Sequence, residues 1–546
     1  MSWLFFVKAL LSVTIPLYTL WSLFRDKFFK GALDNIPGPP AESFFTGVLD
    51  SFFNNHGWDY HKKLAETYGG VMKIKAVFGE NELYVFDPKA LHHIFLKDQD
   101  VYEETPQWIQ GNGVVYGEGL LATLGEQHRK QRKMLNPVFS TAHMRDMMPI
   151  FYDVTSKLRE AMSNRVAEGP KEIDILSWMS RTALELIGES GMGYSFDPLT
   201  ADAAPHPYSK AAKNLELAWG KLRLSTSYLL PPLSKIGSAK FRRFVIDIIP
   251  WKDVHDVRDI VDVLTDTCVK IYDIKTKALA EGDEALAKQI GRGKDIMSIL
   301  MKANMSASKE DSLTKDELLG QMSSLLYAAI DTTSSALSRT LHILATHQDM
   351  QDKLRREIKD AKQEMGGDLP YDQLVALPYL DALCRESLRL HSPVPLVRRI
   401  ARKDIMLPLS TPIKGVDGRE ISEIFVPNDT KLTIGIMASN RNPELWGPDA
   451  HEFKPERWLN PLPDTLTAAH LPGVYSHLMT FIGGSRACIG FKFSQLEMKV
   501  VLLTLIESFR FTLSEKEINW EMVEIVAPVV VGEEVPSLPI VLERIV

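Results

Sequence analysis

Cysteine is scarce in this sequence, which has three cysteines among 546 residues. Cys268, Cys384 and Cys488 are far apart and form no CxxC pair, which argues against a disulfide framework and against a structural zinc site. We therefore expect the folded part of the chain to face a reducing compartment. The sequence also lacks interior Gly/Ser-rich or Pro-rich linkers, charge blocks and repeats, so one large domain is expected despite the length.

An excess of positive charge is absent as well, since the formal net charge is −7 and the basic residues are scattered. The charge therefore gives no electrostatic reason to expect nucleic acid as a partner. Hydrophobic residues make up 45% of the chain and charged residues 24%, which is typical of a folded protein with a large buried core.

The longest hydrophobic run lies at the N-terminus. Trp3–Phe24 is long enough to cross a bilayer at ~1.5 Å per residue, although Lys8 and Pro16 interrupt it. A cleavable signal peptide is the competing interpretation, but no small-residue cleavage site follows. Basic residues follow instead: Arg25, Lys27 and Lys30. We predict an uncleaved, single-pass anchor over residues 1–30, with the folded domain on the cytosolic side.

The segment behind this anchor is rich in proline. Its sequence IPGPP, residues 36–40, can neither continue a helix nor pair as a central strand. We predict a proline-rich hinge over residues 31–42 that holds the domain at a fixed angle to the membrane, with a plain helix stop as the alternative. The folded domain then covers residues 43–546.

Local patterns in this domain predict mainly helices with small β-sheets. The polarity of the side chains alternates over residues 71–78 and again over residues 82–86, with a break between the two runs. This pattern predicts a β-hairpin. Thr314 and Glu317 form a capping box that opens a helix running to about His347. At ~1.5 Å per residue this helix spans about 50 Å, so it must cross the core. Two further helices are predicted: residues 378–390 and an amphipathic helix after Cys488.

The surroundings of Cys488 distinguish it from the other two cysteines. A lone cysteine is usually a small buried hydrophobe. Here neighbouring glycines allow tight backbone conformations and the close approach of a flat group, and a helix begins just after Gly490. Free N–H groups at that helix N-terminus stabilise a thiolate. One thiolate cannot hold structural zinc, but it can be the axial ligand of a haem iron, and Arg486 can then pair with a haem propionate.

The stretch FIGGSRACIG fills every fixed position of FxxGxRxCxG, the haem-binding signature of the cytochrome P-450 family. The matching residues are Phe481, Gly484, Arg486, Cys488 and Gly490. This resemblance implies that all five bind haem b and that Cys488 is the metal ligand. The sequence of residues 128–140, HRKQRKMLNPVFS, is most similar to the sequences of enzymes from filamentous fungi.

The resemblance extends over nearly the whole chain. Glu386 and Arg389 match the family's ExxR motif, and Arg457 lies in a segment similar to PERF, with Trp458 in place of Phe. The family arranges these charges as a buried cluster that locks the chain behind the cysteine loop. A structural role is implied, because breaking a buried ion pair costs about 3–5 kcal/mol.

Three further residues match propionate partners of the family. Residues 125–140 resemble its helix C, in which a Trp and an Arg four residues later hold the propionates. In this chain His128 stands where Trp is usual, and Arg132 stands where the Arg is expected. Arg399, five residues before Asp404, matches another propionate arginine. Solvated surface positions are the alternative for His128 and Arg399.

Asp331 and Thr332 interrupt the apolar stretch LLYAAIDTTSSAL in the long predicted helix. A buried acid and hydroxyl need partners or a water-filled pocket. Taken alone, the pair could be a polar stripe that packs against another helix. Beside a haem it resembles the family's (A/G)GxDT motif, with Ala329 in place of Gly. The resemblance then implies that Thr332 positions a proton-carrying water and that Asp331 relays protons from solvent.

The function implied by the resemblance is that of a haem-thiolate monooxygenase in the endoplasmic reticulum membrane. Its substrate would be a lipophilic small molecule, such as a terpenoid or another specialised metabolite. Because no GxGxxG motif opens a nucleotide-binding unit, electrons would come from a separate NADPH–cytochrome P-450 reductase, with cytochrome b5 as a second candidate donor. Candidates for the docking face are Lys130, Lys133 and Lys492.

Two alternatives to this function remain. One is a haem-thiolate isomerase or dehydratase that needs no external electrons, and the presence of Asp331 and Thr332 disfavours it. The other is a non-catalytic haem sensor, which would not need an acid and an alcohol beside the haem.

Overall fold

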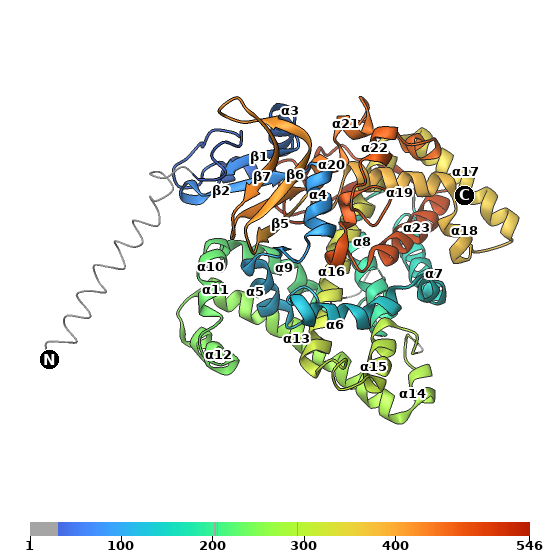
Figure 1. Ribbon diagram of the computed structural model, residues 1–546. Helices are drawn as coiled ribbons and strands as arrows, with labels where there is room; N and C mark the ends of the chain where they lie inside the picture. The colour runs from blue at the N-terminus through green and yellow to red at the C-terminus, as the bar shows by residue number, and fades with distance from the viewer. Residues whose placement is uncertain (1–30, 201–203, 205, 292, 546) are drawn as a thin grey trace, which may run out of the picture.

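The computed structural model describes residues 31–200, 204, 206–291 and 293–545. They form a mainly helical body with a small sheet region at one side (Figure 1), as the sequence predicts. Within the described ranges no helix is both long enough and apolar enough to cross a membrane. The predicted anchor lies outside the described residues, so the anchor stays a prediction.

Helices carry most of the fold. The longer helices are α3 Trp58–Tyr68, α5 Pro106–Tyr116, α6 Gly125–Leu135, α7 Thr141–Arg165, α8 Ile175–Leu186, α9 Pro207–Lys221, α12 Ala239–Ile248, α13 Lys252–Glu281, α15 Ile296–Ser306, α16 Lys315–Thr346, α17 Gln348–Met365, α19 Pro378–Leu390 and α23 Phe491–Ser508. The shorter helices are α2 Leu49–Phe52, α4 Pro88–His92, α10 Arg223–Tyr228, α11 Leu230–Leu233, α14 Asp283–Ala287, α18 Tyr371–Val375, α20 Ile436–Asn440, α21 Pro443–Trp446 and α22 Asp464–Ala468.

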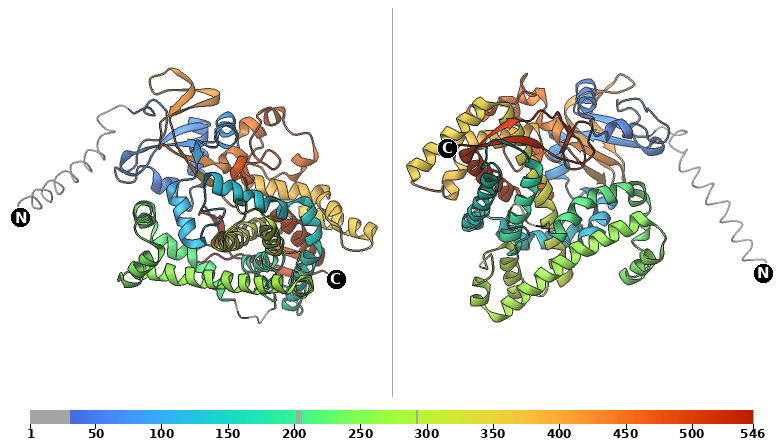
Figure 2. Two further views of the ribbon diagram at one scale, coloured as in Figure 1. Left: turned by 60° about the horizontal axis from the view of Figure 1, so that its bottom comes forward. Right: turned by 180° about the vertical axis from the view of Figure 1, so that it is seen from behind.

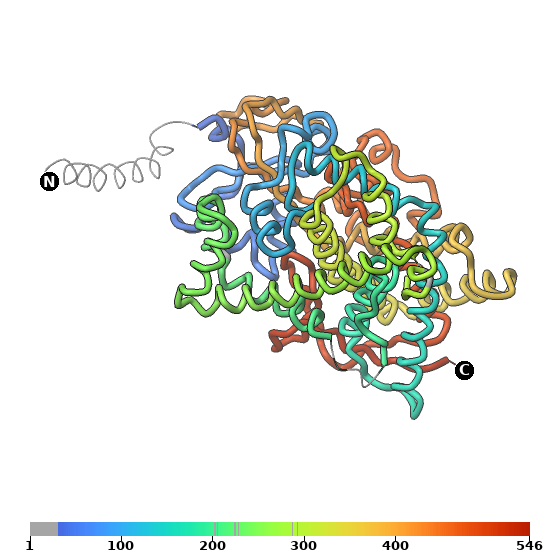
Figure 3. Tube along the Cα trace, turned by 90° about the horizontal axis from the view of Figure 1, so that it is seen from below, coloured from blue at the N-terminus to red at the C-terminus, as the bar shows by residue number. Residues whose placement is uncertain are grey.

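Helix α16 is the central element. The predicted capping box is present, because the Glu317 amide donates to Thr314 Oγ1 at 3.1 Å and the Thr314 amide donates to the Glu317 carboxylate at 2.9 Å. A view nearly along its axis shows α16 at the centre of the surrounding helices (Figure 2). From below, α13 runs along the helical body (Figure 3), where it packs against α9 and α16.

Four small sheets accompany the helices in the described residues. The largest has the strand order β1–β2–β8–β5–β3 and contains the predicted hairpin, and the others are β4–β12–β9, β6–β7 and β10–β11. The strands are β1 Val71–Lys75, β2 Asn81–Val85, β3 Tyr102–Glu103, β4 Lys171–Asp174, β5 Leu396–Ala401, β6 Ile405–Lys414, β7 Glu420–Val426, β8 Lys431–Gly435, β9 Phe509–Leu513, β10 Ile518–Glu521, β11 Ala527–Val530 and β12 Pro539–Arg544. In the largest sheet β2 and β8 are parallel, and the other neighbours are antiparallel.

The predicted proline-rich hinge is attached to the largest sheet. Ile36 is buried, and the Lys73 amide donates to the Pro37 carbonyl oxygen at 2.9 Å. A Cβ at Gly38 would lie 1.8 Å from the Lys73 carbonyl oxygen, so the backbone passes too close to β1 for any other residue. These contacts fix the chain against the domain, while the role of a hinge stays a prediction.

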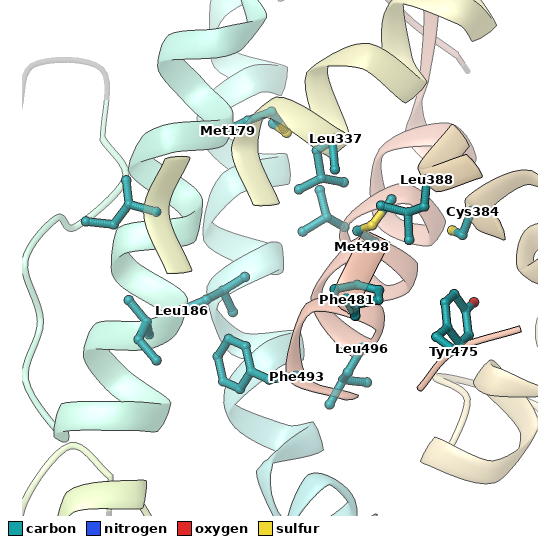
Figure 4. Close-up of a cluster of buried hydrophobic side chains, with 14 of the residues drawn as sticks. Met179, Leu186, Leu337, Cys384, Leu388, Tyr475, Phe481, Phe493, Leu496 and Met498 are labelled. Carbon is teal, nitrogen blue, oxygen red and sulfur yellow. The ribbon is translucent and has the colours of Figure 1, made fainter. Parts of the chain in front are cut away.

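The core joins α23 to α16 and α19. Figure 4 shows part of it, with labelled residues that include Leu337, Leu388, Phe481, Leu496 and Met498. Residues 496–506 of α23 are buried without interruption. The prediction of an amphipathic helix is therefore wrong, because α7, α16 and α17 surround α23 and leave no solvent-facing stripe along this stretch.

Candidate functional site

Cys488 lies in a tight loop just before α23. Its amide donates to the Phe481 carbonyl oxygen at 2.9 Å, so the loop closes across the sequence motif. Gly484 has a φ of +69°, and a Cβ there would lie 1.8 Å from the Phe95 carbonyl oxygen. Glycine is required here for both reasons, the left-handed backbone and the close approach.

Cys488 is the exposed one of the three cysteines, although many protein atoms lie around its thiol. Burial raises the pKa of the thiol, while the backbone N–H of Gly490 and the charge of Arg132 act in the opposite direction. Gly490 caps the N-terminus of α23, so the predicted helix terminus does donate toward the sulfur.

Predicted propionate partners gather around this loop. Arg132 Nη1 donates to the Ala487 carbonyl oxygen at 2.7 Å, and Arg486 Nη2 donates to the Thr123 carbonyl oxygen at 2.6 Å. His128 lies one turn before Arg132 on α6 and is buried, so the surface alternative for His128 is wrong. Burial lowers the pKa of His128 to about 3, and the charges of Arg486 and Arg132 add to this shift. His128 is therefore neutral at physiological pH.

Arg399 completes this group from β5. Its side chain is 3% exposed, and Nη1 donates to the Glu104 carboxylate at 2.8 Å. The surface alternative is therefore wrong for Arg399 also. Burial lowers the pKa of Arg486, the charge of Glu104 opposes this shift, and the charge of Arg399 adds to it. The buried Nη2 of Arg399 has no hydrogen-bond partner among the described residues, so it is a donor in need of an acceptor.

The chemistry of this group fits a haem. It combines one thiol with one buried and two half-buried arginines, which are the ligand types for an axial iron position and for propionates. Arg399 Nη2 supplies an unpaired buried N–H for such a carboxylate. In the described part of the chain, no cluster of three or more His, Cys, Asp or Glu side chains offers another metal site. Cys488 would hold the iron, and Arg132, Arg399 and Arg486 would hold the propionates.

Arg399→Gln is expected to weaken haem retention by about 10- to 100-fold, because a charge-assisted hydrogen bond to a buried carboxylate is lost. The measurement is the rate of haem transfer to excess apomyoglobin. Arg398→Gln is the matched control, since Arg398 is exposed on the same strand and stacks on the Phe53 ring at 4.7 Å. Equal transfer rates for the two variants would show that Arg399 does not hold the haem.

A buried charged cluster lies behind the loop. Arg389 donates two hydrogen bonds of 2.8 Å to Glu386, and both side chains are fully buried. Arg457 lies 3.6 Å from the same carboxylate but is held more closely by Asp449, at 2.8 Å. Trp458 Nε1 also donates to Glu386 at 2.9 Å, so the departure from the PERF pattern supplies a further donor to the cluster.

Helix α16 brings Asp331 and Thr332 into this region. The next residue, Thr333, donates to Ser494 Oγ at 3.4 Å and so joins this turn of α16 to the first turns of α23. Ala328, one turn earlier, is exposed although it lies in the middle of the central helix. The turn of α16 that carries Asp331 and Thr332 therefore lies beside the start of α23, the helix that follows the Cys488 loop.

The acid and the alcohol on α16 have distinct environments. Thr332 Oγ1 donates to the Ala328 carbonyl oxygen at 2.7 Å, which leaves its lone pairs as acceptors for a proton donor such as water. Burial raises the pKa of Asp331 to about 6, and Lys213 opposes the shift. A carboxyl with this pKa can both take up and release a proton near neutral pH.

Two aromatic rings and a second acid lie near Asp331. The Tyr116 and Tyr327 rings stack at 4.5 Å with an interplanar angle of 27°, and Tyr327 shares a helix face with Asp331. Burial raises the pKa of Glu216 to about 8, with a contribution from Asp331, so α9 places a second acid within its electrostatic reach. Sequence reasoning missed Glu216, because its proximity depends on how α9 and α16 pack and no local pattern signals it.

Comparisons with known proteins agree with this geometry. The Cytochrome P-450 family model matches residues 36–528. The chain is 54% identical to cytochrome P-450 monooxygenase 91 of Postia placenta over 531 residues, which cover 96% of this chain and 97% of that protein. Cytochrome P-450 monooxygenase 212 of the same fungus is 48% identical over 539 residues, which cover 97% and 98%. Ganoderic acid synthetase of Ganoderma lucidum is 45% identical over 516 residues, which cover 94% of each chain.

The haem-type donor set around Cys488, the family match over most of the chain and the identity to named monooxygenases lead to one assignment. This chain belongs to the cytochrome P-450 family and is a P-450 monooxygenase, an oxidoreductase.

Proposed function

We propose that this monooxygenase inserts one oxygen atom of O2 into a lipophilic small molecule of specialised metabolism, such as a terpenoid. The observation that carries this proposal is the placement of Asp331 and Thr332 on the turn of α16 that contacts the start of α23, just after Cys488. When bound, haem supplies the iron at which O2 is activated for insertion into a C–H bond. Thr332 holds the proton-donating water, and Asp331 exchanges its proton with solvent.

The lipophilic substrate class is supported by the side chains near these two residues. Tyr116 stacks on Tyr327, one helical turn before Asp331, and aromatic surfaces suit an apolar ligand. The relative named ganoderic acid synthetase supports a product of specialised metabolism. Isomerase, dehydratase and sensor functions have no comparable support, because none of them requires the proton-handling pair.

Contact with the endoplasmic reticulum membrane is also part of the proposal, with residues 1–30 as the anchor. Exposed apolar side chains in the segment 229–251 support a membrane-facing surface: Leu229, Leu233, Ile236, Phe241, Phe244, Ile248, Ile249 and Trp251. Helix α12 in this segment projects from the helical body (Figure 1). An apolar surface of this kind is unusual on a monomer and suits insertion into a membrane interface.

A separate NADPH–cytochrome P-450 reductase is proposed as the electron donor, with cytochrome b5 as a second donor. Two of the predicted docking lysines are already engaged within the chain. Lys130 contacts the Glu317 carboxylate at 3.2 Å, and Lys133 contacts Asp311 at 3.1 Å. Lys492, whose ammonium lies 5.7 Å from the Phe491 ring, is therefore the best supported of the three for docking.

Asp331→Asn is expected to lower product formation by about 10²-fold or more, because general acid–base groups contribute about 10²- to 10⁴-fold. The assay uses the full chain with reductase, NADPH and a panel of lipophilic substrates. For the unmodified chain, turnover should fall as pH rises through about 6, since the pKa of Asp331 is raised to about 6 and the protonated form is the donor. The variant should lack this inflection.

Loss of folding would not explain this result. Burial raises the folded-state pKa of Asp331 above its ordinary value of 3.8, so ionisation of Asp331 costs stability as pH rises from about 4 through 6. Asp331→Asn should therefore unfold at the same or a higher temperature at pH 7. Asp316→Asn is the control, because Asp316 is exposed in the first turn of the same helix. A variant at position 331 with normal turnover and pH profile would remove the proposed proton role.

A further inference from the structure

A second basic site lies further along α16. A cavity of about 590 Å³ is bordered by two arginines and four histidines: Arg339, Arg441, His56, His342, His391 and His451. We call it the basic pocket. Ser335 and Arg339 line it from the turns of α16 that follow Asp331 and Thr332. None of its lining residues is acidic in the described part of the chain.

Arg339 reaches into the basic pocket without a carboxylate partner. Its Nη2 lies 3.5 Å from His391 Nε2, and its guanidinium lies 4.5 Å from the centre of the Trp520 ring. Nε is buried and has no hydrogen-bond partner among the described residues. Burial lowers the pKa of Arg339 to about 9, and the charge of Arg441 adds to this shift. The fold therefore holds a guanidinium where its charge is costly.

Arg441 brings a second guanidinium to the same cavity. Nε and Nη2 both donate to the Leu390 carbonyl oxygen, at 2.8 Å for Nε, which fixes the side chain but leaves its charge uncompensated. Burial lowers its pKa to about 10, and Arg389 adds to this shift. Arg389 itself is paired with Glu386, so this region neutralises one buried arginine and leaves its neighbours without an acid.

The histidines supply hydrogen-bond donors rather than positive charge. Trp520 Nε1 donates to His342 Nδ1 at 3.0 Å, which assigns the ring proton of neutral His342 to Nε2. Burial lowers the pKa of His342 to about 4, and Arg339 adds to this shift. Burial of its ring lowers the pKa of His391, again with a contribution from Arg339, and the residue as a whole is half-buried. At the rim, His56 lies 4.0 Å from Glu521 and is 61% exposed.

We propose that the basic pocket binds a compact oxyanion, a carboxylate or a phosphate, between Arg339 and Arg441. Guanidinium N–H groups match the oxygens of such anions, and a bound anion would offset two half-buried charges that no protein carboxylate offsets. Trp58 and Trp520 form apolar walls, and the cavity has the size of ordinary small-molecule sites. The proposal goes beyond oxygenation and does not depend on it.

The test is thermal unfolding of the haem-loaded full chain in inorganic phosphate or in acetate, each compared with chloride at equal ionic strength. We expect a saturable rise in melting temperature of about 2 °C or more at a hundredfold excess over the dissociation constant. Separate titrations show whether phosphate or carboxylate is preferred. Tryptophan fluorescence should saturate at the same concentrations, because Trp58 and Trp520 line the pocket.

Arg339→Met should remove the saturable rise. Without oxyanion it should melt at or above the temperature of the unmodified chain, because an uncompensated, half-buried charge is gone. Arg339→Gln replaces Arg339→Met in the same measurement if the methionine variant does not fold. Arg419→Gln, at a side chain that is 87% exposed, should keep the full response and controls for general salt effects. A response equal to that in chloride, or one that survives both Arg339 substitutions, would overturn the proposal. The reduced carbon monoxide spectrum, which depends on the cysteine ligand, should be unchanged in each variant.

Discussion

Cys488→Ser is expected to reduce product formation to the background of the assay without enzyme. Serine keeps the size of the side chain but removes the soft thiolate that is expected to ligate the iron and to donate electron density to it. The diagnostic measurement is the carbon monoxide difference spectrum of the reduced protein. The variant should lose the Soret band of thiolate-ligated haem, while any haem it retains gives the band of another axial ligand.

The matched control is Cys268→Ser, which should keep both the spectrum and the activity. Cys268 is buried on α13 and accepts a hydrogen bond from Ser323 Oγ at 3.3 Å, a contact that serine can also make. Burial raises the pKa of its thiol to about 11, so Cys268 stays protonated and is a poor metal ligand. If Cys488→Ser kept the thiolate band, or if Cys268→Ser lost it, Cys488 would not be the iron ligand.

The contrast between these cysteines also shows which structural features can be predicted from a sequence pattern. The motif around Cys488 is local. The sequence alone therefore identifies its glycines and its arginine, and it predicts the helix that follows. The reason why Gly484 must be glycine is not local, because the clash involves the Phe95 carbonyl oxygen, which lies far away in the sequence. Capping boxes and helix-opening prolines are local too, and the predicted helices at residues 315–346 and 378–390 are confirmed.

Contacts between distant segments could not be predicted in this way. The sequence gives no sign that Glu104 pairs with Arg399 or that Glu216 approaches Asp331, because both depend on how separate elements pack. The basic pocket is the clearest case. Its arginines and histidines come from α16, from the end of α19 and from the segments after α20 and before α3, and no spacing along the chain relates them. The burial and the ion pairing of these side chains can therefore be judged only from the folded structure.

Glu386→Gln is expected to lower the free energy of unfolding by about 3–5 kcal/mol and to yield protein depleted of haem. The change keeps the shape of the side chain but leaves Arg389 charged and fully buried without a counterion. It also weakens the acceptor of the Lys454 amide and of Trp458 Nε1, which donate to this carboxylate at 2.9 Å each. Denaturant unfolding and the ratio of haem to protein measure the two effects.

The effect on haem follows from a chain of hydrogen bonds to the cysteine loop. Arg389 Nη1 donates to the Asn440 carbonyl oxygen at 3.1 Å. The Asn440 side chain accepts from the Met479 amide at 2.8 Å and donates to Thr480 Oγ1 at 2.8 Å, immediately before the motif. When Arg389 loses its partner, the segment that positions Phe481 and Cys488 loses its support.

Two comparisons separate this mechanism from a general loss of charge. Lys353→Gln breaks a pair with Glu456 whose side chains are each 42% exposed, and it should cost less than about 1 kcal/mol. The double variant Glu386→Gln, Arg389→Met should be more stable than Glu386→Gln alone, because it removes the uncompensated guanidinium. If the double variant were no more stable, or if Glu386→Gln kept full haem occupancy, the unpaired charge would not be the cause. Recovery of stability without recovery of haem would show that Arg389 holds the loop through Asn440 as well as neutralising Glu386.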